Sequence, residues 1–210
     1  MIPLILRLKK ATHKEIAKAQ DIIVETMYEI FNDAVIHGGT GIWRCYQGNR
    51  FSEDIDVYLS RDIDKINKLF ELFKKKGFQI YKKKIGENSI YSTLSNNGVI
   101  LRFEALFKKI KGSLKEYEKA EGNFITVYTL TAEELIEEKI NTYLKRHKIR
   151  DLYDIFFLLR YANKEILKIK LQKFLKEFKR PADEKELKVL ILEGVIPSID
   201  EMISYIRRKS

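Results

Sequence analysis

The chain has 210 residues, of which 45% are hydrophobic and 33% are charged, with 10 glycines, 3 prolines and 1 cysteine. This composition predicts one or two compact domains and excludes a disordered tail, a collagen-like repeat and a disulfide scaffold. The formal net charge of +10 favours a polyanionic partner, and a solvated lysine-rich surface is the alternative. Abundant Lys, Glu and Ile also match the composition of thermophile proteins. Since no apolar run approaches the ~20 residues of a membrane span, we expect a cytoplasmic protein without a membrane partner.

The first 130 residues combine helical and strand patterns. Apolar side chains recur every three or four residues over 13–31 and 63–76, which is the period of one helix face. Alternation or β-branched and aromatic content predicts strands over residues 34–37, 54–59, 78–82, 89–94, 99–106 and 124–128. Gly77 is placed to end a helix, and Asn97-Gly98 is placed to form a hairpin turn. These patterns predict a mixed β-sheet with helices.

The rest of the chain has a helical pattern throughout. Thr131 followed by Glu134 forms the capping-box signature of a helix start. Helices are predicted over residues 131–146, 150–162, 164–178, 183–193 and 198–208. We therefore predict an α+β protein with an α/β domain over residues 1–130 and a helical domain over residues 131–210.

The most informative stretch runs from residue 37 to residue 56. Gly38 and Gly39 allow backbone amides to approach phosphate oxygens, and the Thr40 hydroxyl adds a donor. Asp54 and Asp56 lie two residues apart on a strand, so they point to one side with about 7 Å between their α-carbons. Two such carboxylates suit Mg²⁺ ions. Each feature alone is common, but their succession favours a nucleoside triphosphate site.

These residues resemble the nucleotidyltransferase superfamily that shares the DNA polymerase β palm. More narrowly, the sequence resembles the AbiEii nucleotidyltransferase toxins of AbiE-type toxin–antitoxin and phage-defence systems, which are related to the MenT toxins. The matching segments are His37-Gly38-Gly39-Thr40, Arg50-Phe51-Ser52-Glu53-Asp54-Ile55-Asp56, Glu137-Glu138-Lys139-Ile140 and residues 146–155. The resemblance implies a polymerase β-like palm followed by a helical domain that contributes Lys139 and Asp151 to the site.

The resemblance also implies an activity. The enzyme would transfer a nucleoside monophosphate from an NTP to an acceptor hydroxyl and release pyrophosphate, with Mg²⁺ or Mn²⁺ as the cofactor. The implied catalytic residues are Asp54, Asp56, Lys139 and Asp151, and the implied nucleotide contacts are Gly38, Gly39, Thr40, Arg50, Ser52 and Lys139. The implied partners are the NTP, RNA with the tRNA 3′ end as acceptor, and a separately encoded antitoxin. A protein or small-molecule acceptor, and a non-catalytic nucleotide- or RNA-binding module, are the alternatives.

A third carboxylate is expected on a strand next to the two aspartates. Alternation over residues 99–105 places Arg102 and Glu104 on one face, so Glu104 is a candidate metal ligand and catalytic residue. The alternative is a cross-strand ion pair. The alternative role of Lys139 is a surface salt bridge to Glu134 or Glu138. The alternative role of Asp151 is to cap the N-terminus of a helix.

Lysine-rich stretches flank the predicted hairpins. They are residues 74–84 and 108–111, and Tyr81 and Tyr91 lie near the first of them. Such stretches track an RNA backbone and stack bases in single-strand binding proteins, or they form solvated faces. The sequence alone leaves both roles open.

Overall fold

The structure is a computed structural model that describes residues 2–210. The chain forms two compact units. The first runs through Gln47 and resumes at Ser52–Thr129, and the second comprises Gly48–Phe51 and Leu130–Ser210. From residue 2 to residue 210, every helix is too short or too polar to cross a lipid bilayer.

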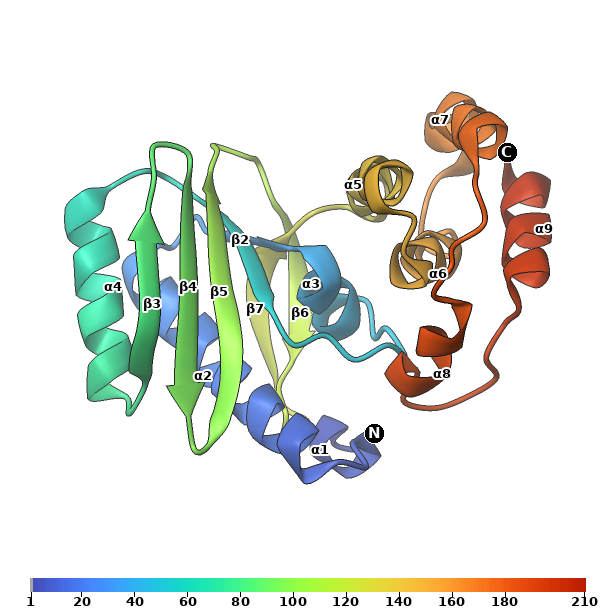
Figure 1. Cartoon of the computed structure of the whole chain (residues 1–210). Helices are drawn as coiled ribbons and strands as arrows, with labels where there is room; N and C mark the ends of the chain where they lie inside the picture. The colour runs from blue at the N-terminus through green and yellow to red at the C-terminus, as the bar shows by residue number, and fades with distance from the viewer. Residues whose placement is uncertain (1) are drawn as a thin grey trace. The chain divides into compact units, whose positions relative to one another are not determined.

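A seven-stranded mixed sheet forms the centre of the first unit (Figure 1). Its strands are β1 (Val35–His37), β2 (Ile55–Leu59), β3 (Gln79–Ile85), β4 (Ser89–Asn96), β5 (Val99–Phe107), β6 (Ser113–Glu118) and β7 (Phe124–Thr129). They lie in the order β3-β4-β5-β2-β1-β7-β6. The β2–β5 and β1–β7 pairs are parallel, and the other neighbours are antiparallel. This confirms the predicted α+β class.

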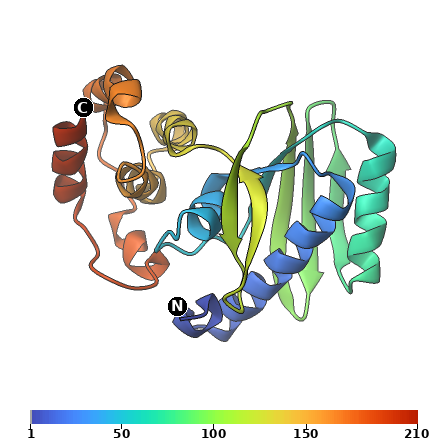
Figure 2. The same ribbon diagram turned by 180° about the vertical axis from the view of Figure 1, so that it is seen from behind.

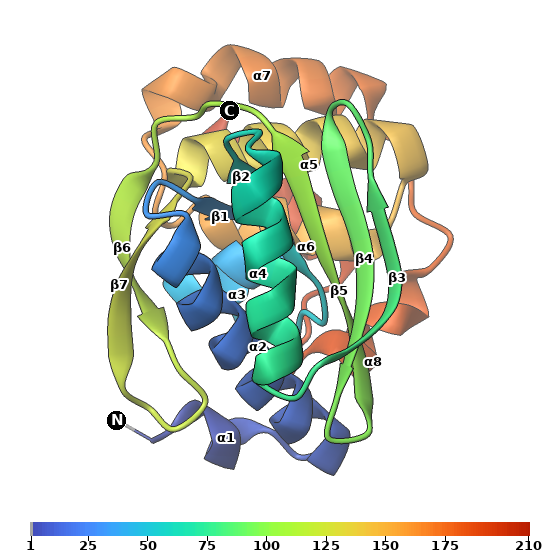
Figure 3. The same cartoon turned by 90° about the vertical axis from the view of Figure 1, so that its left-hand side faces the viewer.

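Two helices cover one face of the sheet, α2 (Ala11–Ile30) and α4 (Ile63–Lys75) (Figure 3). Seen from behind, α2 lies diagonally across the strands (Figure 2). The α4 side chains Phe70 and Phe73 meet Phe103 of β5, with ring centroids 6.3 and 5.6 Å apart. All three rings are buried, and each contributes about 1.5–3 kcal/mol of hydrophobic stabilisation. The apolar positions of these helices thus build the core on this face.

Side-chain alternation gives the sheet a second, more polar face. On β5, Leu101, Phe103 and Ala105 are buried, whereas Arg102 and Glu104 are partly exposed. Since the α2 and α4 layer covers the apolar side, the charged side chains point to the opposite face. The short α1 (Leu4–Arg7) and the eight-residue α3 (Gly38–Cys45) complete the first unit.

The predicted turns have the expected backbone. Asn97 and Gly98 have φ values of 47° and 77°, and Gly77 after α4 has a φ of 89°. These positive angles confirm the hairpin turn between β4 and β5 and the glycine that ends α4. Strand β6 lies outside the predicted elements, because its segment is rich in charged residues. It is an edge strand that pairs with β7 alone.

The second unit is helical. It contains α5 (Ala132–Arg146), α6 (Ile149–Leu158), α7 (Lys164–Glu177), a 3₁₀ turn (Glu184–Glu186), α8 (Leu187–Leu190) and α9 (Ile199–Lys209). Both halves of the predicted capping box are present at Thr131 and Glu134. Leu135, Leu152 and Phe174 are fully buried in its core.

The helix predicted over residues 183–193 was wrong in its extent. The structure has a 3₁₀ turn followed by the single-turn α8. The chain then becomes extended, because the amide of Phe51 donates to Leu190 O at 3.1 Å and that of Leu192 donates to Asn49 O at 2.8 Å. Arg50 and Ile191 form a β-bridge at this point. A tertiary strand pairing therefore overrides the local helical pattern.

Candidate functional site

Asp56 lies at the centre of a row of polar side chains on the polar face of the sheet. The register pairs Asp56 with His37 on β1 and with Glu104 on β5, and Glu104 in turn pairs with Tyr91 on β4. These side chains, together with Ser89 and three apolar neighbours, line a pocket of about 210 Å³. The His37 ring stacks on Tyr58, with centroids 4.1 Å apart. The pocket therefore has two carboxylates side by side on adjacent strands.

Gly38 brings the start of α3 against Asp56. Its φ is +65°, a conformation that side chains with a Cβ rarely adopt. A Cβ at this position would lie 3.0 Å from Asp56 Cγ and 3.1 Å from Asp56 Cβ, and closer still to one carboxylate oxygen. The glycine thus allows the carboxylate to approach a helix N-terminus, where the first backbone amides have no partner within the helix.

Asp54 lies just before β2 and is held by Arg102 of β5. Arg102 Nε donates to Asp54 Oδ1 at 2.9 Å, and its Nη2 binds the other carboxylate oxygen. This bidentate hydrogen bond raises the pKa of Arg102 further above its ordinary value. Arg102 Nε also lies 3.7 Å from Glu104 Oε1. Arg102 thus balances part of the acidic group.

The environment of Glu104 disfavours its charged form. Burial raises the pKa of Glu104, the charges of Asp56 and Asp54 raise it further, and Arg102 opposes them. Across residues 2–210, three acidic, histidine or cysteine side chains are nowhere grouped closely enough to hold a metal ion. The predicted trio of Asp54, Asp56 and Glu104 is therefore present as a neighbouring pair, with Asp54 turned to Arg102.

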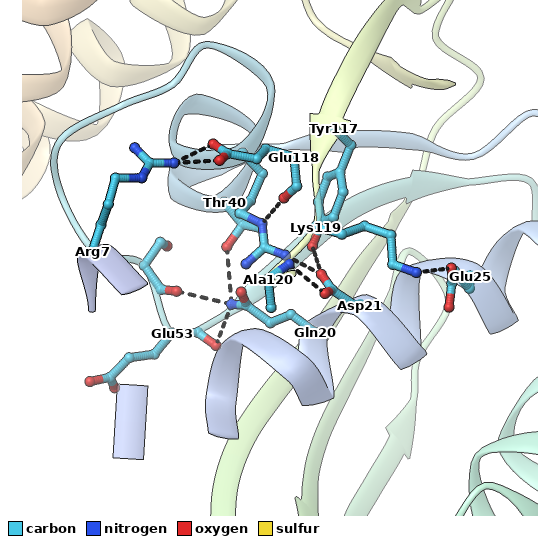
Figure 4. A network of polar contacts seen from close by, with 12 residues as sticks. Arg7, Gln20, Asp21, Glu25, Thr40, Glu53, Tyr117, Glu118, Lys119 and Ala120 are labelled. Atoms are coloured by element: carbon cyan, nitrogen blue, oxygen red, sulfur yellow. Dashed lines mark hydrogen bonds and ion pairs between the residues drawn. The ribbon is translucent and has the colours of Figure 1, made fainter. Parts of the chain in front are cut away.

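A buried glutamine and a threonine fix the loop that leads into β2. Gln20 Nε2 donates to the carbonyl oxygens of Ser52 at 2.9 Å and Glu53 at 3.1 Å (Figure 4). The Thr40 hydroxyl is fully buried and donates to Asp54 O. The Thr40 side chain thus orders the loop. Because its hydroxyl is used in this contact, the donor that Thr40 can offer to a phosphate is its backbone amide. Gln20 lies on α2, outside the motifs that predicted the site.

A second buried network anchors α3 from its C-terminal half. Arg44 is buried between the rings of Trp43 and Tyr117, at 4.9 and 4.6 Å from their centroids. Its Nε donates to Glu118 O at 2.7 Å, and its Nη2 pairs with Asp21 of α2. The Tyr117 hydroxyl also donates to Asp21 Oδ1 at 3.3 Å (Figure 4). The polar contacts of Arg44 thereby join α3 to α2 and β6, which keeps the glycine turn in place.

The second unit brings together the other predicted residues in a buried ion-pair cluster. Lys139 Nζ lies 2.7 Å from Asp154 Oδ2 and 3.4 Å from Asp151 Oδ1. Arg50 binds Asp154 through two contacts of 2.8 Å, and Arg146 binds Asp151 through contacts of 2.7 and 2.9 Å. Burial favours a higher pKa for Asp154, but the charges of Arg50 and Lys139 outweigh it and lower the pKa. Three cations against two carboxylates leave this cluster with a formal charge of +1.

The cluster changes two of the predicted roles. Asp151 is not the N-cap of α6, because Lys148 occupies the N-cap and Asp151 lies in the first turn. Its carboxylate is fully buried and forms ion pairs with Arg146 and Lys139. Arg50, expected to bind nucleotide, is 6% exposed and pairs with Asp154. Asp154 was part of a matching segment but was not assigned to the site.

The mixed sheet with an acidic strand beside a glycine turn, followed by a helical unit, defines a nucleotidyltransferase-like fold. The sequence matches the family described as "Nucleotidyl transferase AbiEii toxin, Type IV TA system" over residues 26–202. The chain therefore belongs to the AbiEii family of nucleotidyltransferase toxins of type IV toxin–antitoxin systems, and the resemblance identified from its motifs is confirmed.

Several solved structures share the fold of this chain. JHP933 from Helicobacter pylori superposes with a TM-score of 0.66 at 18% sequence identity, over 95% of this chain and 90% of that one. The nucleotidyltransferase toxin MenT4 from Mycobacterium tuberculosis superposes with a TM-score of 0.64 at 16% identity, over 95% of this chain and 84% of that one. No curated protein matched the sequence.

Proposed function

We propose that this enzyme transfers a nucleoside monophosphate from an NTP to a hydroxyl at the 3′ end of an RNA, with tRNA as the acceptor, in a Mg²⁺-dependent reaction. The observation that carries the proposal is the Asp56–Glu104 pair, in register on adjacent strands and directly beside the Gly38 turn. Phosphate chemistry on this fold needs carboxylates close to backbone amides. The Asp56–Glu104 pair lies beside the first turn of α3, whose leading amides have no partner within the helix.

The residues of the site fit a divalent cation. Carboxylate oxygens are the ligands that Mg²⁺ and Mn²⁺ prefer. Burial raises the pKa of Glu104, and the repulsion between the Glu104 and Asp56 carboxylates raises it further. A cation would relieve that repulsion. Asp56 and Glu104 would hold the metal, and Asp54 would join them on release from Arg102. When bound, the metal supplies positive charge that polarises the phosphate oxygens.

The chain's own residues would divide the work of the transfer. The acceptor oxygen forms a bond to the α-phosphorus, and the bond from that phosphorus to the bridging oxygen of pyrophosphate breaks. Glu104, which lies beside Asp56 on the adjacent strand, receives the proton of the acceptor hydroxyl as the general base. The amides of Gly38, Gly39 and Thr40 at the start of α3, and Ser52 in the following loop, bind the triphosphate.

Lys139 and Asp151 enter this proposal through the family resemblance. The excess positive charge of the cluster around Lys139 suits a site that offsets triphosphate charge. Asp151 would position Lys139, while the arginines hold the carboxylates. An antitoxin partner follows from the type IV toxin–antitoxin family itself. RNA is the acceptor that the net charge of +10 favours.

A labelling experiment tests the proposal. Purified protein is incubated with each α-labelled NTP, Mg²⁺ and total RNA, beside RNA whose 3′ diol has been oxidised with periodate. We expect label on a tRNA-sized band, none on oxidised RNA, and none with an Asp56→Ala variant. Label on protein or on a small molecule, with none on RNA, would refute the RNA acceptor and leave nucleotidyl transfer intact.

A further inference from the structure

The outer strands of the sheet extend the polar face away from the pocket. The register pairs Lys84 of β3 with Tyr91 of β4, and Tyr91 with Glu104, which itself pairs with Asp56. Paired residues on adjacent strands point to the same face. Lys84, Tyr91, Glu104 and Asp56 therefore form one row across four strands. A second row next to it contains Lys82, Thr93 and Arg102.

This part of the face is basic and accessible. Strands β3 and β4 contain three lysines and no acidic residue, and the side chains of Lys82 and Lys84 are exposed. Lys83 points to the opposite face, where its ammonium lies over the Phe70 ring of α4 at 4.6 Å. The positive charge is thus divided between the two faces, with two lysines on the side of the acidic pocket.

Tyr91 connects these lysines to the pocket. The Lys82 ammonium lies 4.9 Å from the centroid of the Tyr91 ring, and Tyr91 lines the pocket together with Asp56 and Glu104. Tyr91 is partly exposed, so part of its side chain is accessible beside the positive charges. An aromatic ring flanked by cations is the arrangement that binds unpaired bases and their phosphates.

We propose that Lys82, Lys84 and Tyr91 form an acceptor track that binds the single-stranded end of the RNA and leads it to Asp56 and Glu104. The lysines contact phosphates and Tyr91 stacks on a base. From β3 to β2 there are three strand spacings, or about 14 Å, which is the length of about four stacked nucleotides. The inference rests on the proposed function, because it assigns a surface to the acceptor of the same reaction.

The lysines are tested with a fluorescein-labelled 12-nucleotide single-stranded RNA, without NTP. Its dissociation constant is measured by fluorescence anisotropy at several salt concentrations. For the double variant Lys82→Ala/Lys84→Ala we expect about tenfold weaker binding at 0.1 M salt. The slope of log Kd against log salt should fall by about 1.4, since each lost phosphate contact on a single strand contributes about 0.7. Calorimetric NTP binding should stay unchanged.

The matched control removes two exposed lysines from the opposite side of the sheet. Lys68→Ala/Lys75→Ala on α4 changes the net charge equally and should leave both the affinity and the salt slope near wild type. At the aromatic position, Tyr91→Leu should weaken RNA binding about five- to hundredfold, whereas Tyr91→Phe keeps the ring and should retain it.

The acceptor track is overturned if the Lys82/Lys84 double variant binds the RNA like wild type, if the α4 control weakens binding equally, or if Tyr91→Leu and Tyr91→Phe behave alike. A wild-type protein that does not bind the RNA also overturns it. Failure of the proposed function looks different. There, wild type binds the RNA through these residues but transfers no nucleotide to it, which leaves the RNA-binding surface standing.

Discussion

Replacing Gly38 by alanine tests how the acidic site is built. The residue has a φ of +65°, and such a conformation costs a residue with a Cβ about 1–2 kcal/mol. The new methyl group would also lie 3.0 Å from Asp56 Cγ, so the whole Asp56 side chain has to move. Since the Asp56 side chain can change its rotamer more easily than a backbone segment can move, we expect the clash to lower transfer activity more than it lowers stability.

Gly98→Ala is the matched control. Its φ is +77°, and a Cβ there would have no neighbour within 4 Å. Both variants should lose about 1–2 kcal/mol in urea denaturation. Gly98→Ala should keep the wild-type kcat/KM, and Gly38→Ala should lose at least about a hundredfold, because small displacements of a reacting group have effects of that size. Equal kcat/KM values for the two variants would refute the reasoning.

Three further predictions concern charges. Asp154→Asn leaves two buried cations short of a carboxylate and should cost about 3–5 kcal/mol at pH 7 by urea denaturation. The pKa of Asp154 is lowered in the folded protein, so the stabilisation from its charge is complete above about pH 4 and is lost as the pH falls through the folded-state pKa. The stability cost of Asp154→Asn should therefore shrink in acid. A cost that stays constant with pH would contradict the ion pair. Glu104 has a raised pKa in the folded protein, so its charge opposes folding above that pKa. Without metal, the Glu104→Gln variant should be more stable than wild type by less than about 1 kcal/mol at pH 7 and equally stable at pH 3. A gain in stability at both pH values would argue against this effect of the Glu104 charge. Arg102→Gln frees Asp54 and should tighten Mn²⁺ binding up to about fivefold by calorimetry, and weaker binding would exclude competition by Arg102.

Most helices and strands were predicted from local sequence patterns. Period and turn chemistry were enough for α2, α4, the β4–β5 hairpin and the capping box of α5. Strand β6 was missed because an edge strand keeps many polar residues, and only pairing with β7 shows it as a strand. The helix expected over residues 183–193 was cut short by backbone bonds to residues 49–51, which no local pattern reveals.

The same division applies to the site. Alternation placed Asp54 and Asp56 on one face, and the structure sets Glu104 directly opposite Asp56. The pairing of Arg102 with Asp54 and the two partners of Asp154 depend on which elements become neighbours. Strand register and helix packing decide those contacts, and periodicity within one segment carries no information about them.

The most direct test of nucleotidyl transfer compares two positions of the label on one NTP. Protein, Mg²⁺ and RNA are incubated with NTP labelled at either the α- or the γ-phosphate, and pyrophosphate is measured in parallel. We predict that the acceptor gains the α-label alone, with one pyrophosphate released per transfer, and that Asp56→Asn abolishes both. Transfer of the γ-label, or α-label transfer that is unaffected by Asp56→Asn, would contradict the assignment of the reaction to this site.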